Sequence, residues 1–364
     1  MSSIGKLYHE WSEQLSSLWE WKRAEHRRVL TWLMVAIFVG KEVCLDRLGL
    51  HLPREAKPES IGRQFRRWLK NEAIESRMIY DPIARQIVEK MRCGRLRIQL
   101  DRVQIKRRQN VLMLSVWYRQ RAIPLAWICL AHGGQSAYRH WVELLDYLES
   151  ILPSNKTVLI LADREFGSVD RLRYVTHKGW AYAIRLKGNG YFYDPDWGQP
   201  FDWWQLDAIS PRPGNRYAIS DLCLGMTEFF PFHLACAWAI GSDDPWFIAT
   251  NLPHPLTALK EYARRFACEE LFSDLKKRGF NWEDSMIRDP HRFDRLILAL
   301  ALLVVFLLTL GRRLRLHHLD LEIVSPSHRR RLSLFQTARR WLKRRLSQDR
   351  LPDWFFAQPF WYFS

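Results

Sequence analysis

Five consecutive apolar residues at positions 158–162, Val-Leu-Ile-Leu-Ala, constrain the fold of this chain more than any other segment. An apolar run of this length that ends at a charged residue is typical of a strand buried on both faces of a sheet. Such a strand needs covering helices on each side. Asp163 follows the run directly, where an unpaired charge would be costly.

The segments around this run predict strands and helices in a fixed order. Alternation at 96–100 predicts a strand that ends at Asp101, and 111–118 and 122–130 predict two more strands joined by a hairpin. Helical patterns follow at 137–152 and 169–177, with a further strand at 181–186. The resulting βββαβαβ order predicts an α/β fold with a mixed sheet and flanking helices.

Residues 1–94 are predicted to form a helical DNA-binding region. One helix is expected at 30–48 and another from Ser60. The second helix carries four basic residues at spacings that place them on one face, as in a helix-turn-helix unit: Arg63, Arg66, Arg67 and Lys70. An ordinary solvated helix face explains the same spacing equally well.

The remaining chain divides by composition. Residues 95–186 and 253–311 are predicted to form the two parts of one catalytic domain. Residues 187–252 are rich in aromatic residues such as Trp197 and are predicted to be a β-rich insertion, with strands at 233–240 and 246–249. Helices resume near Leu256. Residues 312–364 are predicted to be a basic C-terminal helical region, whose arginine clusters suit phosphate contact or form a solvated tail.

The net charge of +17 favours a polyanionic partner, because 56 Lys and Arg outnumber 39 Asp and Glu. Nucleic acid is the commonest such partner, and a basic protein with a solvated surface is the alternative. The six cysteines form no Cys-x-x-Cys pair, which argues against a zinc site or a disulfide framework.

An apolar run at 296–310 resembles a membrane span. It has 15 residues, fewer than the ~20 that a bilayer requires, so we expect a helix buried inside the protein. With no signal-peptide pattern in view, the expectation is a cytoplasmic, nucleoid-associated protein without membrane contact.

Three carboxylates are the candidates for chemistry. Asp101 and Asp163 follow predicted strands, at the sheet edge where ligands gather, although single strand-end aspartates are common. Glu269 lies on a predicted helix that also carries Tyr262, Arg265 and Lys276. At ~100° per residue these four share an arc of about 60°. That face suits a metal ion on Glu269 with a phosphate held by the two cations. An exposed ion pair between Arg265 and Glu269 explains only part of it.

These residues resemble a known family. The pattern Tyr-x2-Arg-x3-Glu-x6-Lys at 262–276 is similar to that of the DDE transposases of insertion sequence family four. Residues 161–166, with Asp-Arg-Glu, resemble the motif of the second aspartate, and 100–102 resemble the first. The likeness spans about 96–310. It departs at Val103, where relatives often carry Thr, and that position is not a metal ligand.

The resemblance implies a ribonuclease H-like catalytic domain in which Asp101, Asp163 and Glu269 bind two Mg²⁺ ions, which Mn²⁺ can replace. It implies cut-and-paste transposition of double-stranded DNA, with transposon ends and target bound by a homodimer. Arg265 and Lys276 would hold terminal phosphates, with Tyr262 nearby. By motif position, Trp246 would stack on a base flipped out beside a hairpin intermediate. Burial of Trp246 in the core is the alternative.

Two other functions fit the same residues. A structure-specific nuclease of the same fold would cut DNA without joining it, so joined products would exclude it. A DNA-binding regulator with a degenerate catalytic domain would bind its DNA without cutting it in the presence of a metal.

Overall fold

The computed structural model describes residues 2–106, 109–130, 134, 136–196, 202–352 and 355, so Trp197 lies outside the described residues. In these ranges the strands form one sheet, in the order β3-β2-β1-β4-β5-β10-β9-β8-β6-β7. The strands are β1 Arg95–Ile105, β2 Gln109–Tyr118, β3 Arg121–Leu130, β4 Thr157–Ala162, β5 Ala181–Arg185, β6 Tyr191–Tyr193, β7 Trp204–Gln205, β8 Arg216–Leu224, β9 Phe230–Ala237 and β10 Trp246–Thr250. The α-helices are α1 Ser3–Leu18, α2 Ala24–Gly40, α3 Leu45–Leu48, α4 Pro58–Lys70, α5 Ser76–Lys90, α6 Tyr138–Ile151, α7 Val169–His177, α8 Thr257–Ala263, α9 Phe266–Leu275, α10 Pro290–Leu316 and α11 Leu334–Ser347.

The sheet is mixed, and its centre is the apolar strand β4. β4 runs parallel to β1 on one side and to β5 on the other, while β1 and β2 and then β2 and β3 pair antiparallel. Residues 158–162 are all buried, as a strand covered on both faces requires. The predicted α/β fold with a mixed sheet and flanking helices is therefore confirmed, and it is consistent with a ribonuclease H-like domain.

Asp101 does not end its strand, so that prediction was wrong. β1 continues to Ile105 because Val103 and Ile105 keep the apolar alternation and pair with Val111 and Gln109 of β2. The parallel partner β4 stops earlier, with Ala162 opposite Leu100. Asp101 and Asp163 therefore each lie one residue beyond the last parallel pair, side by side at the carboxyl end of β4.

The strands of residues 187–252 extend the same sheet. β10 returns beside β5, with Ile248 opposite Arg185, and then pairs with β9. The strand predicted at 246–249 is confirmed, whereas the strand predicted at 233–240 is shifted to Phe230–Ala237. It ends early because the chain turns at Ile240 and Gly241, and the indole N–H of Trp238 donates across this turn to the carbonyl of Ser242 at 3.0 Å.

The helix predicted at 30–48 has different bounds. α2 begins at Ala24 and ends where Lys41 takes a left-handed conformation at φ 55°. α4 begins at Pro58 rather than Ser60, since proline suits a first helical position. On α4, Phe65, Trp68 and Leu69 are buried, and the four predicted basic residues are exposed.

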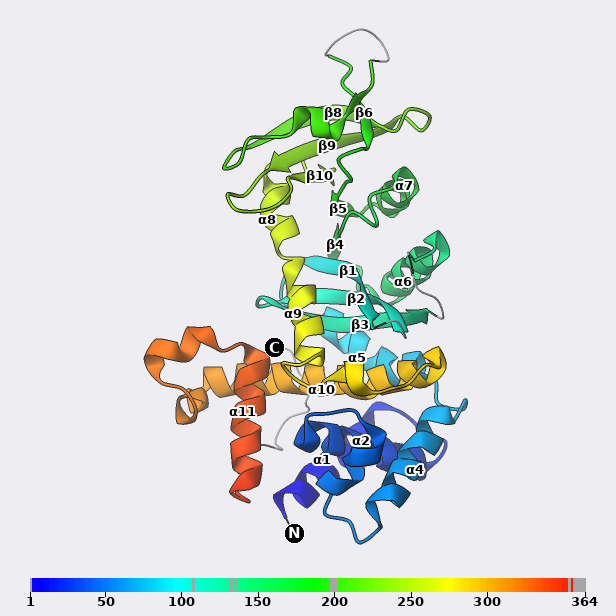
Figure 1. Ribbon diagram of the computed structural model, residues 1–364, viewed down its shortest axis with the longest axis vertical. Helices are drawn as coiled ribbons and strands as arrows, with labels where there is room; N and C mark the ends of the chain where they lie inside the picture. The colour runs from blue at the N-terminus through cyan, green and yellow to red at the C-terminus, as the bar shows by residue number, and fades with distance from the viewer. Residues whose placement is uncertain are drawn as a thin grey trace.

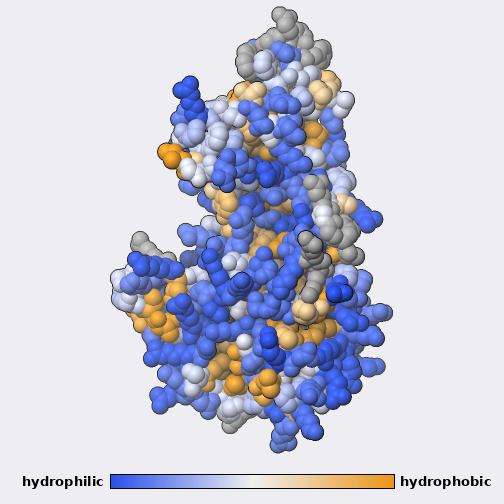
Figure 2. Space-filling view, viewed as in Figure 1, coloured by the Kyte–Doolittle hydropathy of each residue, from blue (hydrophilic) through white to orange (hydrophobic). Residues whose placement is uncertain are grey.

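α10 is a central support of the molecule. Its 27 residues include the predicted apolar run, so the expected buried helix is present but longer than the run itself. By length and composition it is the one helix in the described ranges that could cross a membrane, and 89% of its most apolar window is buried inside the protein. Figure 1 shows it lying between the sheet and the N-terminal helices. The face in Figure 2 is predominantly hydrophilic, as a strongly charged chain requires.

Candidate active site

Helices α8 and α9 are attached to one face of β1. Residues 97, 99 and 101 point to this face because alternate residues of a strand share a side. These three side chains contact successive residues of α8 and of the turn that follows it. The contacts are Arg97 with Glu261 at 2.6 and 3.0 Å, the Gln99 amide with the Arg264 carbonyl at 2.5 Å, and Asp101 with Arg265 at 2.5 Å. This series fixes where the following turn, which carries Glu269, meets the sheet.

The helical segment predicted at 262–276 is not continuous. A turn at Arg264 and Arg265 separates α8 from α9, and i→i+3 hydrogen bonds tighten it. The carbonyl of Arg264 accepts the Gln99 amide, which a strand supplies and a helical pattern does not reveal. Lys276 follows the last residue of α9 with a non-helical ψ of −143°. Tyr262 and Lys276 therefore do not share one regular helix face with Glu269.

Arg265 joins two of the three predicted carboxylates. One guanidinium nitrogen donates to Asp101 Oδ2 at 2.5 Å and another to Glu269 Oε1 at 2.6 Å. Asp101 Oδ1 also accepts the backbone N–H of Arg102 at 2.9 Å. The Asp101 side chain is 9% exposed and that of Glu269 is 51% exposed, so the pair reaches from the interior to solvent.

Asp163 is half-buried, and its Oδ1 accepts the backbone N–H of Glu165 at 2.9 Å. Burial raises the pKa of Asp101 to about 7, Arg265 opposes this, and the negative charges of Asp163 and Glu269 add to the rise. Residues from β1, from the end of β4 and from α9 thus lie close enough for their charges to interact. The structure brings the three predicted carboxylates together.

A second ion pair fixes the two aspartates relative to one another. Arg102 follows Asp101, and its Nε lies 2.6 Å from Oε2 of Glu165. The other carboxylate oxygen of Glu165 accepts the backbone N–H and the hydroxyl of Ser136, each at 3.0 Å. Sequence reasoning assigned no role to Arg102 or Glu165. The signal was their position, each within two residues of a candidate aspartate.

The donor chemistry of this site fits a divalent metal ion, although the arrangement does not yet form a metal cage. Carboxylate oxygens are the ligands that Mg²⁺ takes, and crowded negative charge at a half-buried edge favours a cation. Within the described ranges, no three His, Cys, Asp or Glu residues are placed so that they could hold a metal as they stand. The guanidinium of Arg265 lies between Asp101 and Glu269 and neutralises them instead.

An aromatic group lies next to Arg265. Its guanidinium is 5.6 Å from the ring of Tyr262 and 5.2 Å from that of Phe266. Trp246 is half-buried and contacts both rings, edge-on to Tyr262 at 5.0 Å and tilted against Phe266 at 5.8 Å. Tyr262 is buried, and burial raises its pKa. Lys276 pairs with Glu283 at 3.7 Å.

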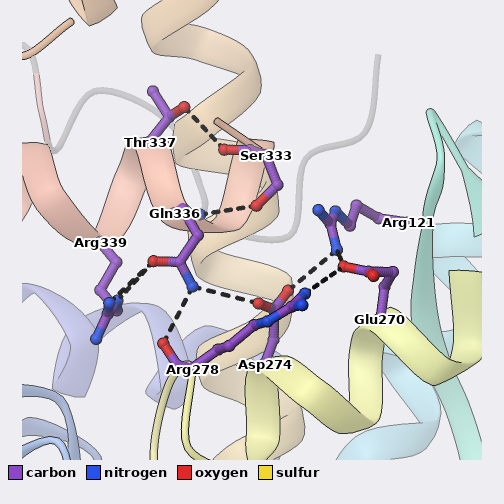
Figure 3. Close-up of polar contacts among 8 residues, drawn as sticks. All are labelled: Arg121, Glu270, Asp274, Arg278, Ser333, Gln336, Thr337 and Arg339. Carbon is purple, nitrogen blue, oxygen red and sulfur yellow. Dashed lines mark hydrogen bonds and ion pairs between the residues drawn. The ribbon is translucent and has the colours of Figure 1, made fainter. Parts of the chain in front are cut away.

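The far end of α9 has its own polar network (Figure 3). Arg121, the first residue of β3, contacts Glu270 at 2.8 Å and Asp274 at 3.5 Å. The Gln336 amide on α11 donates to Asp274 at 3.3 Å and to the Arg278 carbonyl at 3.1 Å. Burial raises the pKa of Asp274 to about 6, with Arg121 opposing it. This network, which sequence reasoning missed, fixes the rotation of α9.

The predicted DNA-binding residues are partly engaged within the protein. Arg66 on α4 pairs with Asp46, while Arg63, Arg67 and Lys70 have no ion pair among the described residues. In the C-terminal region, Arg329 holds Asp320 through two contacts of 2.6 and 2.9 Å. Arg345 lies 2.5 Å from Glu322, and its guanidinium is 5.2 Å from the Trp341 ring. Not every arginine of the predicted clusters is therefore available to a ligand.

Comparison with protein-family models identifies a transposase domain. A family model described as the transposase DDE domain matches residues 106–306, which is more than half of the chain. The match includes Asp163 and Glu269 and begins after Asp101. No curated protein matches the chain.

Proposed function

Because the chain belongs to the transposase DDE domain family, we propose that it is a cut-and-paste DNA transposase of the type found in insertion sequence family four. Membership of this family implies a nuclease or transposition enzyme that acts on DNA and uses divalent metal ions. The finer proposal concerns the reaction sequence, hydrolysis at the terminal inverted repeats followed by joining to a target, and the residues that carry it.

The observation that carries the proposal is the meeting of Asp101, Asp163 and Glu269 at the carboxyl edge of β4. Asp101 and Asp163 are neighbours across the parallel pair of β1 and β4. Glu269 reaches the same point because Arg265 binds it and Asp101 at once. Three acids from distant segments, coupled through their charges, are the donor set that an in-line displacement at phosphorus requires.

In this proposal Asp101, Asp163 and Glu269 hold two Mg²⁺ ions, or Mn²⁺ in their place. When bound, such ions would activate the attacking hydroxyl group and stabilise the leaving oxygen. Arg102 and Glu165 keep the two aspartates aligned throughout. Arg265 leaves the carboxylates and pairs with a DNA phosphate, for which its planar group is suited.

The neighbouring side chains are given supporting roles. Tyr262 and Lys276 act at the terminal phosphates, and Trp246 offers a ring to a base that leaves the stack beside a hairpin intermediate. The exposed basic residues of α4 and the region 312–350 bind the ends of the element. The working unit is a homodimer on two DNA ends in the cytosol, at the nucleoid.

The test uses labelled duplexes that carry the element's own terminal repeats, a target plasmid and Mg²⁺. Wild-type protein should nick the ends and then join them to the plasmid. Asp163→Asn should lose both products by about 10³-fold or more while it binds the ends as before. Cutting without joining would replace the proposal with a nuclease, and binding without cutting would replace it with a regulator.

A further inference from the structure

A strongly basic groove lies away from the three carboxylates. It consists of two adjacent hollows of about 230 and 500 Å³ that share Trp117, Arg119 and Arg312. We call it the arginine groove and define it by Arg95, Arg97, Trp117, Arg119, Arg312 and Arg315. In the part of the chain that the structure describes, no acidic residue lines either hollow.

The groove is formed by segments that are distant in sequence. Arg95 and Arg97 come from β1, Arg119 from the turn between β2 and β3, and Arg312 and Arg315 from the end of α10. In Figure 1 the turn and the end of α10 lie on the left, and the outline of the molecule in Figure 2 is indented on that side. Three elements thus direct positive charge into one concave surface.

Most of these arginines have no ion-pair partner within the described part of the protein. Arg97 pairs with Glu261, but Arg95, Arg119, Arg312 and Arg315 have no ion pair among the described residues. Nε of Arg312 is buried and has no hydrogen-bond partner there. Burial lowers the pKa of Arg315; the carboxylate of Asp320 opposes this, while the positive charges of Arg329, Arg121 and Arg119 lower the pKa further. Guanidinium groups that outnumber the acids around them are stabilised by a bound anion.

Trp117 lines both hollows of the groove, and its ring holds two guanidinium groups. Its ring is half-buried, with the guanidinium of Arg97 at 5.9 Å and that of Arg264 at 5.2 Å. Two cation–π contacts on one indole restrict the rotation of these long side chains. A surface that holds its cations in place loses less conformational entropy when a phosphate binds.

The groove lies on the same face as the carboxylates. Arg97 and Asp101 are four residues apart on one side of β1, which is about 13 Å at ~3.3 Å per residue. Successive phosphates of one DNA strand are about 3.4 Å apart along the helix axis, so that distance corresponds to roughly four nucleotides. We propose that the arginine groove is a second DNA-binding site, which holds the phosphodiester backbone about four nucleotides from the phosphate that is cut. This proposal rests on the proposed function for the identity of the anion.

The test is a comparison of salt-dependent DNA binding by full-length protein. Arg119→Gln/Arg312→Gln removes two cations of the groove, and the control Arg173→Gln/Arg212→Gln removes two from exposed sites elsewhere. Fluorescence anisotropy is measured on a duplex with the element's end and on a random duplex. The groove variant should bind about tenfold more weakly and lower the slope of log K against log salt by ~1.8, as expected for two lost phosphate contacts. The control should change neither value, and thermal unfolding checks that both variants fold.

The two duplexes identify the source of the backbone. A loss confined to end DNA assigns the groove to the element, a loss confined to random DNA assigns it to the target, and a loss on both supports a general backbone contact. An unchanged slope on both duplexes would overturn the proposal. This failure is separate from failure of the proposed function, in which wild-type protein binds through the groove but cuts neither duplex.

Discussion

The two ends of α9 show the same local chemistry in different surroundings. Each end has one arginine between two carboxylates: Arg265 between Asp101 and Glu269 at the start, and Arg121 between Glu270 and Asp274 at the end. At the far end the acids have further partners in Arg278 and Gln336. At the near end a third acid, Asp163, faces the pair instead.

This difference separates an anchoring site from the proposed reactive one. The far network has enough donors for its carboxylates, so it holds α9 in place. The near network has one acid more than its arginine can satisfy, and its outer member, Glu269, is half exposed to solvent. An arginine between two acids is therefore not evidence of catalysis by itself. Excess negative charge that solvent can reach is what distinguishes the near end, to which the proposed function assigns metal and DNA.

The largest expected effect compares neighbouring glutamates on α9. Glu269→Gln should reduce Mg²⁺-dependent cleavage of end DNA by about 10³-fold or more, because it removes a proposed metal ligand. Glu270→Gln changes the same chemical group one residue later and should alter cleavage by less than ~3-fold. Rates are measured on the same labelled duplex. Equal losses in the two variants would remove the distinction between the ends.

A second comparison uses the two arginines and needs no DNA. Arg121→Ala leaves the buried Asp274 short of a partner and should destabilise the protein by about 3–5 kcal/mol. Arg265→Ala also destabilises, but it frees Asp101 and Glu269 for a cation. Addition of Mn²⁺ should therefore raise the unfolding temperature of Arg265→Ala more than that of Arg121→Ala or wild type. Equal Mn²⁺ responses, read by thermal unfolding, would show that the near end takes no metal.

The smallest expected effect concerns pH. Asp274 has a pKa of about 6 in the folded protein against an ordinary value of 3.8, so the folded state holds the proton more tightly. Its contribution to stability therefore declines as pH rises from about 4 to about 6, by roughly 2–3 kcal/mol at ~1.36 kcal/mol per unit. Asp274→Asn should lack this decline. Unfolding temperatures of both proteins across the window test it, and parallel curves would contradict it.

Local sequence patterns predicted the strands and helices around the carboxylates because alternation and apolar runs report burial directly. The apolar run before Asp163 became the central strand, and both flanking helices formed close to their predicted bounds. The pattern failed at Asp101, where the end of a strand depends on its partner. β1 extends beyond the end of β4 because β2 continues to pair with it, and only the strand pairing in the folded sheet shows this.

The site was less accessible to sequence reasoning than the fold. The three acids could be proposed because each has a characteristic neighbourhood. The break between α8 and α9 could not, since it involves the side chain of Gln99, more than 160 residues earlier. The same holds for the pair of Arg102 with Glu165, and for the arginine groove, whose residues converge from β1, a hairpin and α10. Contacts across such separations leave no periodic trace in a single sequence.

The order in which the chain is synthesised affects how α10 becomes buried. This helix packs on α2, α4, α5 and β3, all of which precede it in the sequence, and on α11 and the short 3-10 helix Leu319–Glu322, which follow. Because synthesis proceeds from the N-terminus, the elements α2, α4, α5 and β3 are already outside the ribosome when the apolar residues of α10 emerge. The longest apolar helix in the described ranges thus meets a protein surface that is already synthesised, and its contacts with Leu319–Glu322 and α11 form only after those segments are made.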